Sequence, residues 1–581
     1  MPAETLVSSI APTLLDVYPD KATYRPGEPA CIVAELRNNG PADFNGSIHL
    51  QLVQLDQALT QKEAAVHLST GEQAVITVPL TLPAEDFRGY GVELRLLDAQ
   101  GQEIASASTA LDVLSDWTLA PRYGFLADFA PGEPDSEARV AQLSKYHVNV
   151  VQFYDWMYRH YQLLPLEGQE EFVDALGRHL SLQTVQAKIA AAHAHNMAAL
   201  AYGAVYGAEP EYFVQHRDEA LYQASGEPYS VDKLFYIMNI QPNSPWSGHI
   251  VSEYVRTVTE LSFDGIHMDQ YGFPKMAHVG SGDGPVVALD DLFGPLINAS
   301  AAAVRAANPS ARVIFNNVNN WPTDKTAMAD QAAIYIEVWT PYDTYRDLQR
   351  LIQKAWKLGR GEKQVILAAY ITPLCQARDN PSLLPMAEEA ARLANAAILA
   401  NGGFHLLLGE QNGALCDPYY PKYATLRPEF ARIMRAYADF SVRYLNSLFN
   451  PALTDHSGRD QQEAATLYTL EGIDSNPKAY RGTVWTIRRQ APGLITLSLI
   501  NLRGQQNNYW NLPHVPPEPL SDIPVVLYTD KPVRAVFVAS PDFEAGRARQ
   551  LPFTHMDSGT GIRFTVPRLD RWTLVIVKTG C

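Results

Sequence analysis

The sequence predicts a multidomain protein in which a central (β/α)8 TIM barrel lies between an N-terminal immunoglobulin-like β-sandwich and a C-terminal antiparallel β-sandwich domain. A chain of 581 residues is too long for one ordinary core. Short alternating strands dominate its two ends, and in its middle part apolar strands alternate with helical stretches. We expect domains at residues 1–115, 116–447 and 448–581.

The N-terminal region reads as all-β. In residues 90–109, Val92, Leu94 and Leu96 alternate with charged residues, and a turn follows at residues 98–101. Similar short strands recur through the region without a clear long helix, which is typical of an immunoglobulin-like sandwich.

The middle region contains eight strand candidates separated by helical material. They span residues 122–129, 149–156, 197–207, 263–270, 312–319, 333–339, 364–371 and 403–410. Residues 384–403 are a typical helical stretch, with Pro385 suited to the first turn and Gly402 suited to the end. A doubly wound sheet is the alternative, but no G-x-G-x-x-G turn follows the first strand. After residue 450 the helices give way to alternating strands again.

Composition and charge limit the partners. With 46 Lys+Arg against 63 Asp+Glu, the formal net charge is -17. Such acidity disfavours nucleic acid or an anionic membrane as a partner, whereas a neutral substrate is no obstacle. No apolar run reaches the roughly 20 residues that span a bilayer. The 29 Tyr and 9 Trp suit sugar stacking and core filling equally. We expect a monomer.

The four cysteines, Cys31, Cys375, Cys416 and Cys581, form no C-x-x-C pair, which argues against a zinc site or a disulfide scaffold. Whether Cys375 and Cys416 pair is left open. The opening residues, MPAETLVSSIAP, lack the basic and apolar regions of a secretory signal. The chain is then either intracellular (cytoplasmic) or the mature form of a secreted protein.

Polar and aromatic residues follow nearly every predicted strand, where a barrel carries its active site. They are Asp128, Tyr154, Asp155, Trp156, Tyr206, Asp269, Asn316, Asn317, Asn319, Glu337, Trp339 and Glu410. Strand alternation places Asp269 on the face opposite Ile266 and Met268, and Glu337 on the face opposite Ile336. If the aliphatic faces meet the helices, both carboxylates point into the mouth.

Two carboxylates on the fourth and sixth strands can lie roughly 5 Å apart, the spacing of a retaining glycosidase. Glu337 has the more apolar sequence neighbours and suits the protonated acid/base, and Asp269 suits the ionised nucleophile. From local sequence alone, a structural carboxylate or a cap explains each residue equally well.

Three stretches, NVVQFYDWMYRH (149–160), FDGIHMDQYG (263–272) and IYIEVW (334–339), together resemble glycoside hydrolase family 66, the endo-dextranases and cycloisomaltooligosaccharide glucanotransferases. The resemblance covers nearly the whole chain. It implies retaining cleavage of α-1,6-glucan, with Asp269 as nucleophile and Glu337 as acid/base. The glucanotransferase members carry a carbohydrate-binding module between the seventh and eighth strands. Here about 30 residues, mostly one helix, separate those strands, so hydrolysis is favoured over cyclisation.

We therefore predict an endo-dextranase that hydrolyses internal α-1,6 bonds of dextran to isomaltooligosaccharides. The alternatives are a cycloisomaltooligosaccharide glucanotransferase and a non-catalytic α-glucan-binding protein. A polymer substrate favours secretion. We expect no cofactor and no metal, because the pair His267 and Asp269 has no third ligand at a convincing spacing.

The remaining candidates are predicted to bind substrate, each against a structural alternative. His267 either supports the nucleophile or fills the core, the asparagines either bind hydroxyls or cap loops, and Glu410 either contacts a hydroxyl or caps a turn. The predicted binding residues are Tyr154, Asp155, Trp156, Tyr206, His267, Gln270, Asn316, Asn319, Trp339 and Glu410.

Overall fold

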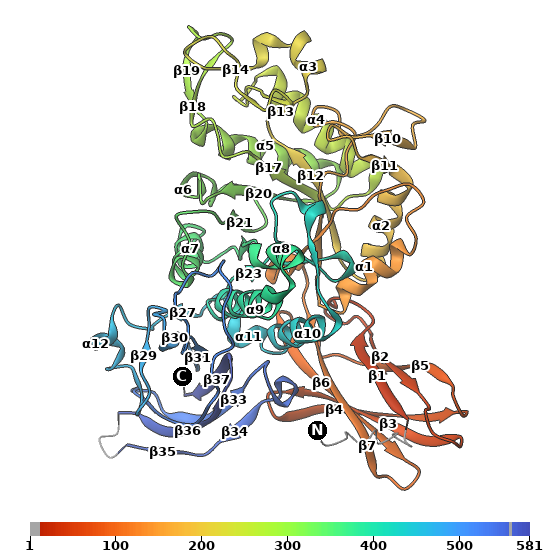
Figure 1. Ribbon diagram of the computed structural model, residues 1–581, viewed down its shortest axis with the longest axis vertical. Helices are drawn as coiled ribbons and strands as arrows, with labels where there is room; N and C mark the ends of the chain where they lie inside the picture. Colours follow the sequence, from red (N-terminus) through yellow and green to blue (C-terminus); the bar gives the residue numbers. More distant parts are fainter. Residues whose placement is uncertain (1–11, 557–559, 581) are drawn as a thin grey trace.

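The protein is multidomain and rich in β-structure, and the computed structural model describes residues 12–556 and 560–580 (Figure 1). The opening residues 1–11, which lack a signal pattern, lie outside the described part. Two β-rich regions at the ends of the chain lie below a central region of mixed strands and helices. Each end region has its own buried apolar cluster, and the largest cluster fills the centre. The boundaries at residues 115 and 447 stay predictions.

The N-terminal region consists of two antiparallel sheets around one core. The sheets have the orders β1-β2-β5 and β4-β3-β6-β7. Val92, Leu94 and Leu96 are fully buried in β6, whereas Arg95 is exposed, so the predicted alternation is confirmed. The strands are β1 (Thr13–Pro19), β2 (Ala30–Arg37), β3 (Phe44–Gln54), β4 (Gln57–Leu68), β5 (Gln73–Leu80), β6 (Arg88–Asp98) and β7 (Glu103–Val113).

The central region is built on a curled sheet of parallel strands, and all eight predicted strand segments contribute to it. They form β8 (Tyr123–Leu126), β9 (Val150–Phe153), β12 (Ala198–Ala204), β17 (Gly265–Asp269), β20 (Arg312–Val318), β21 (Ile334–Glu337), β22 (Val365–Ala368), and the short pieces β23 (Phe404–His405) and β24 (Leu408–Gly409). β23 pairs in parallel with β22, and β24 pairs in parallel with β8. One short segment, residues 404–409, thus hydrogen-bonds to strands from both ends of the region.

Helices separate these strands along the chain. They include α1 (Ser136–Ser144), α2 (Leu182–Ala194), α4 (Pro245–Leu261), α5 (Asp290–Ala307), α7 (Tyr345–Leu358), α8 (Thr372–Asp379), α9 (Leu384–Ala400) and α10 (Pro428–Arg443). Pro385 lies in the first turn of α9, and Gly402 follows its end with φ +82, as predicted. The segment between β22 and β23 contains both α8 and α9, where one main helix was expected. Within residues 12–556 and 560–580, no helix has the length and apolar character needed to cross a membrane.

Short strands extend the region between β12 and α5, at the top of Figure 1. They are β13 (Gly207–Ala208), β14 (Leu221–Tyr222), β15 (Ser230–Val231), β16 (Phe235–Ile237), β18 (Met276–Val279) and β19 (Val286–Ala288), accompanied by α3 (Pro210–Gln215). They follow the ends of β12 and β17, so they extend the protein on the side where those strands finish.

The C-terminal region also consists of two antiparallel-rich sheets around their own core. Its main strands are β27 (Thr454–Asp455), β28 (Tyr468–Leu470), β30 (Val484–Ala491), β31 (Leu494–Asn501), β32 (Leu520–Leu527), β33 (Val533–Ala539), β34 (Arg549–Leu551), β35 (Phe553–His555), β36 (Ile562–Leu569) and β37 (Trp572–Thr579). The segment between β31 and β32 reaches the central region. There the Trp510 indole N–H donates to the carbonyl of Tyr342 at 2.7 Å, and Thr372 N–H donates to the Asn511 side chain at 2.8 Å.

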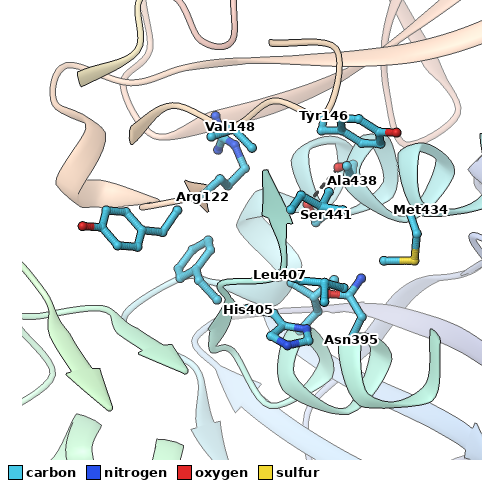
Figure 2. A pocket seen from close by; sticks show the side chains of 13 residues that line it. Arg122, Tyr146, Val148, Asn395, His405, Leu407, Met434, Ala438 and Ser441 are labelled. Carbon is cyan, nitrogen blue, oxygen red and sulfur yellow. Dashed lines mark hydrogen bonds between the residues drawn. The ribbon is translucent and has the colours of Figure 1, made fainter. Parts of the chain in front are cut away.

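A small cavity lies at the amino ends of β8 and β23, between the sheet and helices α9 and α10 (Figure 2). Its volume of about 60 Å³ is enough for about two waters. His405 lines it, and burial lowers the pKa of this imidazole to about 4, so the ring is neutral. Because the predicted site residues follow the opposite ends of the strands, this cavity is separate from them.

Cys375 in α8 and Cys416 form a disulfide with a Cα–Cα distance of 5.6 Å, which resolves the pairing that the sequence left open. Cys416 closely follows β25 (Gly413–Ala414). Tyr420, four residues further on, stacks on Tyr154 with ring centroids 4.1 Å apart. The disulfide therefore fastens α8 to a loop that carries aromatic side chains to the carboxyl end of β9.

We expect the double variant Cys375→Ser/Cys416→Ser to be less stable by about 2–4 kcal/mol, because the crosslink restricts the unfolded chain. The measurement is the thermal unfolding midpoint with and without dithiothreitol. The reductant should lower the midpoint of the parent and leave that of the double variant unchanged. Equal midpoints for the reduced and oxidised parent would contradict the prediction.

Candidate active site

Asp269 and Glu337 are the last residues of β17 and β21, and β20 pairs with both strands. Ile266, Met268 and Ile336 are fully buried on the opposite face, as the alternation predicted. One residue pair deeper, the rings of His267 and Tyr335 meet edge to face with centroids 4.8 Å apart. The two carboxylates therefore lie above a common floor inside the curl of the sheet.

Asn316 on β20 connects the two carboxylates. Its side-chain N–H₂ group donates to Asp269 Oδ1 at 2.7 Å and to Glu337 Oε2 at 2.9 Å. These two oxygens therefore cannot be farther apart than the sum of the two distances, about 5.6 Å. That spacing matches a carboxyl pair set for direct attack, whereas pairs with a water between them lie roughly 6.5–9.5 Å apart.

A tyrosine hydroxyl holds the other oxygen of each carboxylate. Tyr202 donates to Asp269 Oδ2 at 2.7 Å, and Tyr370 donates to Glu337 Oε1 at 2.8 Å. Both tyrosines and Asn316 are buried, whereas Asp269 and Glu337 are only half-buried. The carboxylates are therefore fixed in orientation by buried groups and still reach solvent.

Neither tyrosine was predicted. Tyr202 pairs with His267 in the register of β12 and β17, and Ala204 pairs with Asp269. Strand alternation over residues 197–207 could have identified Tyr202 as a candidate, because it places Tyr202 on the same face as the predicted Tyr206. Tyr370 follows the seventh strand, the one strand end for which no candidate was named.

The two acids are electrostatically coupled. Burial and the nearby charge of Asp269 raise the pKa of Glu337 to about 7. Burial also raises the pKa of Asp269, while hydrogen bonds from Tyr202 and Asn316 oppose that rise. At neutral pH the pair therefore retains a proton, and Glu337 is the better place for it.

A buried imidazole with a raised pKa, that of His160, lies on the Asp269 side of the pair. Burial opposes protonation of His160, but the Glu209 carboxylate, 3.0 Å from the imidazole, outweighs it and raises the pKa of His160. Burial raises the pKa of the neighbouring Asp155 to about 6, against the charges of His160 and Arg178. His160 in turn favours the ionised form of Asp269. His160 was not among the predicted site residues.

Three predicted binding residues are half-buried beside the carboxylates, and a fourth, Asp155, is buried with 6% of its surface exposed. Trp339 is half-buried and stacks on Tyr370 at 5.1 Å, so it borders Glu337. Tyr154 is half-buried against Tyr420, and Asp155 follows it. Asn319 is half-buried, and its amide donates to the carbonyl of Thr340 at 2.8 Å. Their contact with a substrate stays a prediction.

Three aromatic or amide candidates have structural roles instead, because neighbouring groups cover them completely. Trp156 is fully buried and donates to the carbonyl of Tyr202 at 3.2 Å. Tyr206 is fully buried and donates to the carbonyl of Phe273 at 2.7 Å. The side chain of Gln270, 1% exposed, donates to the carbonyl of Asn316 at 3.2 Å. We correct their assignment as sugar contacts: they hold the strand ends that carry the acids.

Two more candidates also need correction. His267 is buried, accepts or donates a hydrogen bond at 2.8 Å with Tyr123, and is neutral because burial lowers its pKa to about 3. It forms part of the core below Asp269. Asn316 is 4% exposed, and its N–H₂ group bonds both acids while its buried Oδ1 has no protein partner in the described part of the chain, so we assign its amide N–H₂ group to support of the acids rather than to sugar binding.

Glu410 is fully buried and belongs to a separate ionic cluster. One of its carboxylate oxygens accepts hydrogen bonds from the backbone N–H groups of Ala127 and Asp128 at 2.8 and 3.0 Å. The other oxygen pairs with the ammonium of Lys188. Lys188 also pairs with Glu133 at 2.7 Å. Asp128, Glu133 and Glu410 could together surround a metal ion, but the Lys188 ammonium already pairs with two of them. Glu410 is therefore corrected from a substrate contact to a structural anion that fastens the end of β8.

Comparisons with known proteins agree on one family. The model described as glycosyl hydrolase family 66 matches residues 19–576. A cycloisomaltooligosaccharide glucanotransferase of Niallia circulans is 25% identical over 97% of this chain and 71% of its own length. A dextranase of Streptococcus salivarius is 23% identical over 92% of this chain and 73% of its own length.

Among solved structures, a Paenibacillus cycloisomaltooligosaccharide glucanotransferase complexed with cycloisomaltoheptaose has a TM-score of 0.89 and 24% identity, over 97% of this chain and 99% of that one. At this identity the likeness shows a shared fold.

We expect Glu410→Ala to lower stability by about 3–5 kcal/mol, because it leaves the buried Lys188 ammonium with Glu133 alone and removes the acceptor of the Ala127 and Asp128 N–H groups. Glu429→Ala, which removes an exposed carboxylate from the first turn of α10, is the matched control and should change stability by less than about 0.5 kcal/mol. Thermal and urea unfolding of both variants provide the measurement. Equal stability of the two variants would show that the cluster contributes little.

Proposed function

Because the chain belongs to glycosyl hydrolase family 66, we propose that it is an endo-dextranase that hydrolyses internal α-1,6-glucosidic bonds with retention of configuration. One observation carries this proposal: the Asn316 amide holds one oxygen of Asp269 and one of Glu337 within about 5.6 Å of each other. A retaining double displacement needs two carboxyl groups at about that spacing.

In the first step an Asp269 oxygen attacks the anomeric carbon while the bond to the glycosidic oxygen breaks. Glu337 donates its proton to that oxygen, and the shortened glucan leaves. In the second step the Glu337 carboxylate takes a proton from water, and the water oxygen attacks the same carbon and releases Asp269. Each displacement inverts the carbon, so the product retains the α configuration.

The surroundings of the pair support this division of roles. His160, with its raised pKa, favours charge on Asp269, and the pKa of Glu337 near 7 keeps a proton available for the leaving oxygen. Tyr202 and Tyr370 remain protonated donors, because burial raises the pKa of each hydroxyl well above its usual value. They act as positioning residues for the two carboxylates.

A glucanotransferase is the second candidate, since a sugar hydroxyl can replace water in the second step. Two curated relatives carry that name. The segment between β22 and β23 contains α8, a short 3-10 turn and α9, and it offers no room for the module that the resemblance associates with cyclisation. Analysis of dextran digests decides between the two, because rings resist trimming by an exo-glucosidase.

Finer features of the chain belong to the same proposal. We infer that the curled sheet is a (β/α)8 barrel, closed where residues 404–409 pair with both β22 and β8. The flanking regions are interpreted as an immunoglobulin-like sandwich and a second β-sandwich. A disulfide and a polymeric substrate both favour a secreted protein.

Replacing either acid should abolish or greatly reduce turnover of dextran. Glu337→Gln should lower kcat by about 10²–10⁴, because general acid catalysis contributes that much to departure of a poor leaving group. An aryl glucoside with an activated leaving group should still form the glycosyl intermediate in this variant. Asp269→Gly removes the nucleophile and should leave no hydrolysis in assays of reducing-end release.

The control is Asp324→Asn, which changes an exposed carboxylate in α6 (Thr323–Thr326) and should keep full activity. Circular dichroism checks that each variant is folded. A fluorinated glucosyl donor should label a peptide containing Asp269. Full activity of folded Asp269→Gly would reject the mechanism and favour a non-catalytic glucan-binding role.

Tyr370→Phe should move the alkaline limb of the pH profile of kcat/KM to higher pH. The hydroxyl donates to the ionised form of Glu337 and so lowers its pKa. Without that bond the pKa rises, and the acid stays protonated to higher pH. Tyr419→Phe, which changes a half-buried tyrosine that lies against Tyr154, is the control and should leave the limb near pH 7. A shift to lower pH would contradict the prediction.

A further inference from the structure

Two cavities follow the outer face of α7, where this helix borders the C-terminal region. One has a volume of about 250 Å³ and the other about 480 Å³, and Gln353 and Asp455 line both. The larger is near the start of α7 and the smaller near its end. We call the two cavities together the α7 seam.

The sequence of α7 explains why this face is polar. Leu348, Leu351, Ile352 and Ala355 are buried in the core. Side chains spaced three or four residues apart on the other face line the seam. They are Arg346, Gln349, Arg350, Gln353, Trp356 and Lys357. The helix therefore presents an indole ring, two amides and several cations to the seam, where Arg350 and Lys357 remain exposed to solvent.

The opposite wall comes from the chain around β27 and β30. Arg489 donates to the carbonyl groups of Leu448 and Leu453, and Asp455 accepts a hydrogen bond from Gln353. Near Arg346 and Arg350 this wall contributes Glu463, which pairs with Arg459 at 2.8 Å. Both signs of charge are thus present, which disfavours a simple anion site.

We propose that the α7 seam binds glucosyl units of an α-glucan chain at a position separate from the two acids. Carbohydrate recognition combines an aromatic surface with side chains that both donate and accept hydrogen bonds. Trp356 supplies the ring, and the half-buried Gln353, whose N–H₂ group also bonds Asp455, supplies an amide that can both donate to and accept from hydroxyl groups. The volume of the smaller cavity alone equals that of about eight waters, enough for a pyranose ring.

This inference rests on the proposed function, because a polymer can occupy the mouth and the seam at once. A second contact on the same chain raises its effective concentration at the active site without altering the chemistry. Short substrates cannot span both places. The seam should therefore affect the KM for dextran and leave the turnover of isomaltotriose unchanged.

The test compares Trp356→Ala and Gln353→Ala with Lys354→Ala, a matched control on the exposed part of the same helix that does not line the seam. Trp356 packs on Gly361, so removing the Trp356 ring can loosen the turn after α7. Gln353→Ala tests the seam without removing that ring. Both seam variants should raise the KM for dextran several-fold. All three should keep the parental kcat/KM for isomaltotriose.

Binding is measured separately by electrophoresis through dextran-containing native gels, with Glu337→Gln as the parent so that the polymer is not cut. Adding Gln353→Ala or Trp356→Ala should reduce the retardation, and adding Lys354→Ala should not. Unchanged retardation and KM in both seam variants would overturn the inference. Failure of the wild-type protein to cleave dextran would overturn the proposed function alone, because the gel comparison needs no cleavage.

Discussion

The structure around the strand ends depends on keeping two carboxylates within about 5.6 Å of each other in partly dry surroundings. At that distance and an effective dielectric constant of about 20, two full negative charges repel by about 3 kcal/mol. Partial burial limits how far solvent relieves this repulsion, which favours keeping one proton on the pair near neutral pH. The neighbouring groups determine which carboxylate carries the proton, and Asn316 keeps the two carboxylates close enough to repel each other.

The groups below and beside the two acids make Asp269 and Glu337 differ in how readily each one ionises. His267, directly beneath Asp269 on β17, is neutral because burial lowers its pKa to about 3, so it contributes no charge. The imidazole with a raised pKa is instead His160, which lies 3.0 Å from the Glu209 carboxylate and favours ionised Asp269. Glu337 has only neutral donors, among them Tyr370 and Asn316. A neutral His267 and a His160 with a raised pKa therefore favour ionisation of Asp269 over ionisation of Glu337.

Periodicity was sufficient to predict the eight central strands and to place Asp269 and Glu337 on one face at two strand ends, because both depend on local alternation. The catalytic roles of these two acids came from the resemblance and stay a prediction. The sequence could not show which polar side chains are covered by neighbours. Trp156, Tyr206 and Glu410 follow strand ends as Trp339 does, yet burial by distant segments gives them structural roles. The dual contact of Asn316 depends on the register of β20 between β17 and β21, which no local pattern encodes.

The supports of the site come from well beyond the sheet that carries the acids. Trp339 borders Glu337, and the loop that follows it is held by Trp510 through the carbonyl of Tyr342. Asn511 holds Thr372, two residues after Tyr370. On the opposite side the Cys375–Cys416 disulfide secures the loop that brings Tyr420 against Tyr154. Because these loops emerge from strand ends with few contacts of their own, the C-terminal region and the disulfide supply the rigidity that two closely spaced acids require.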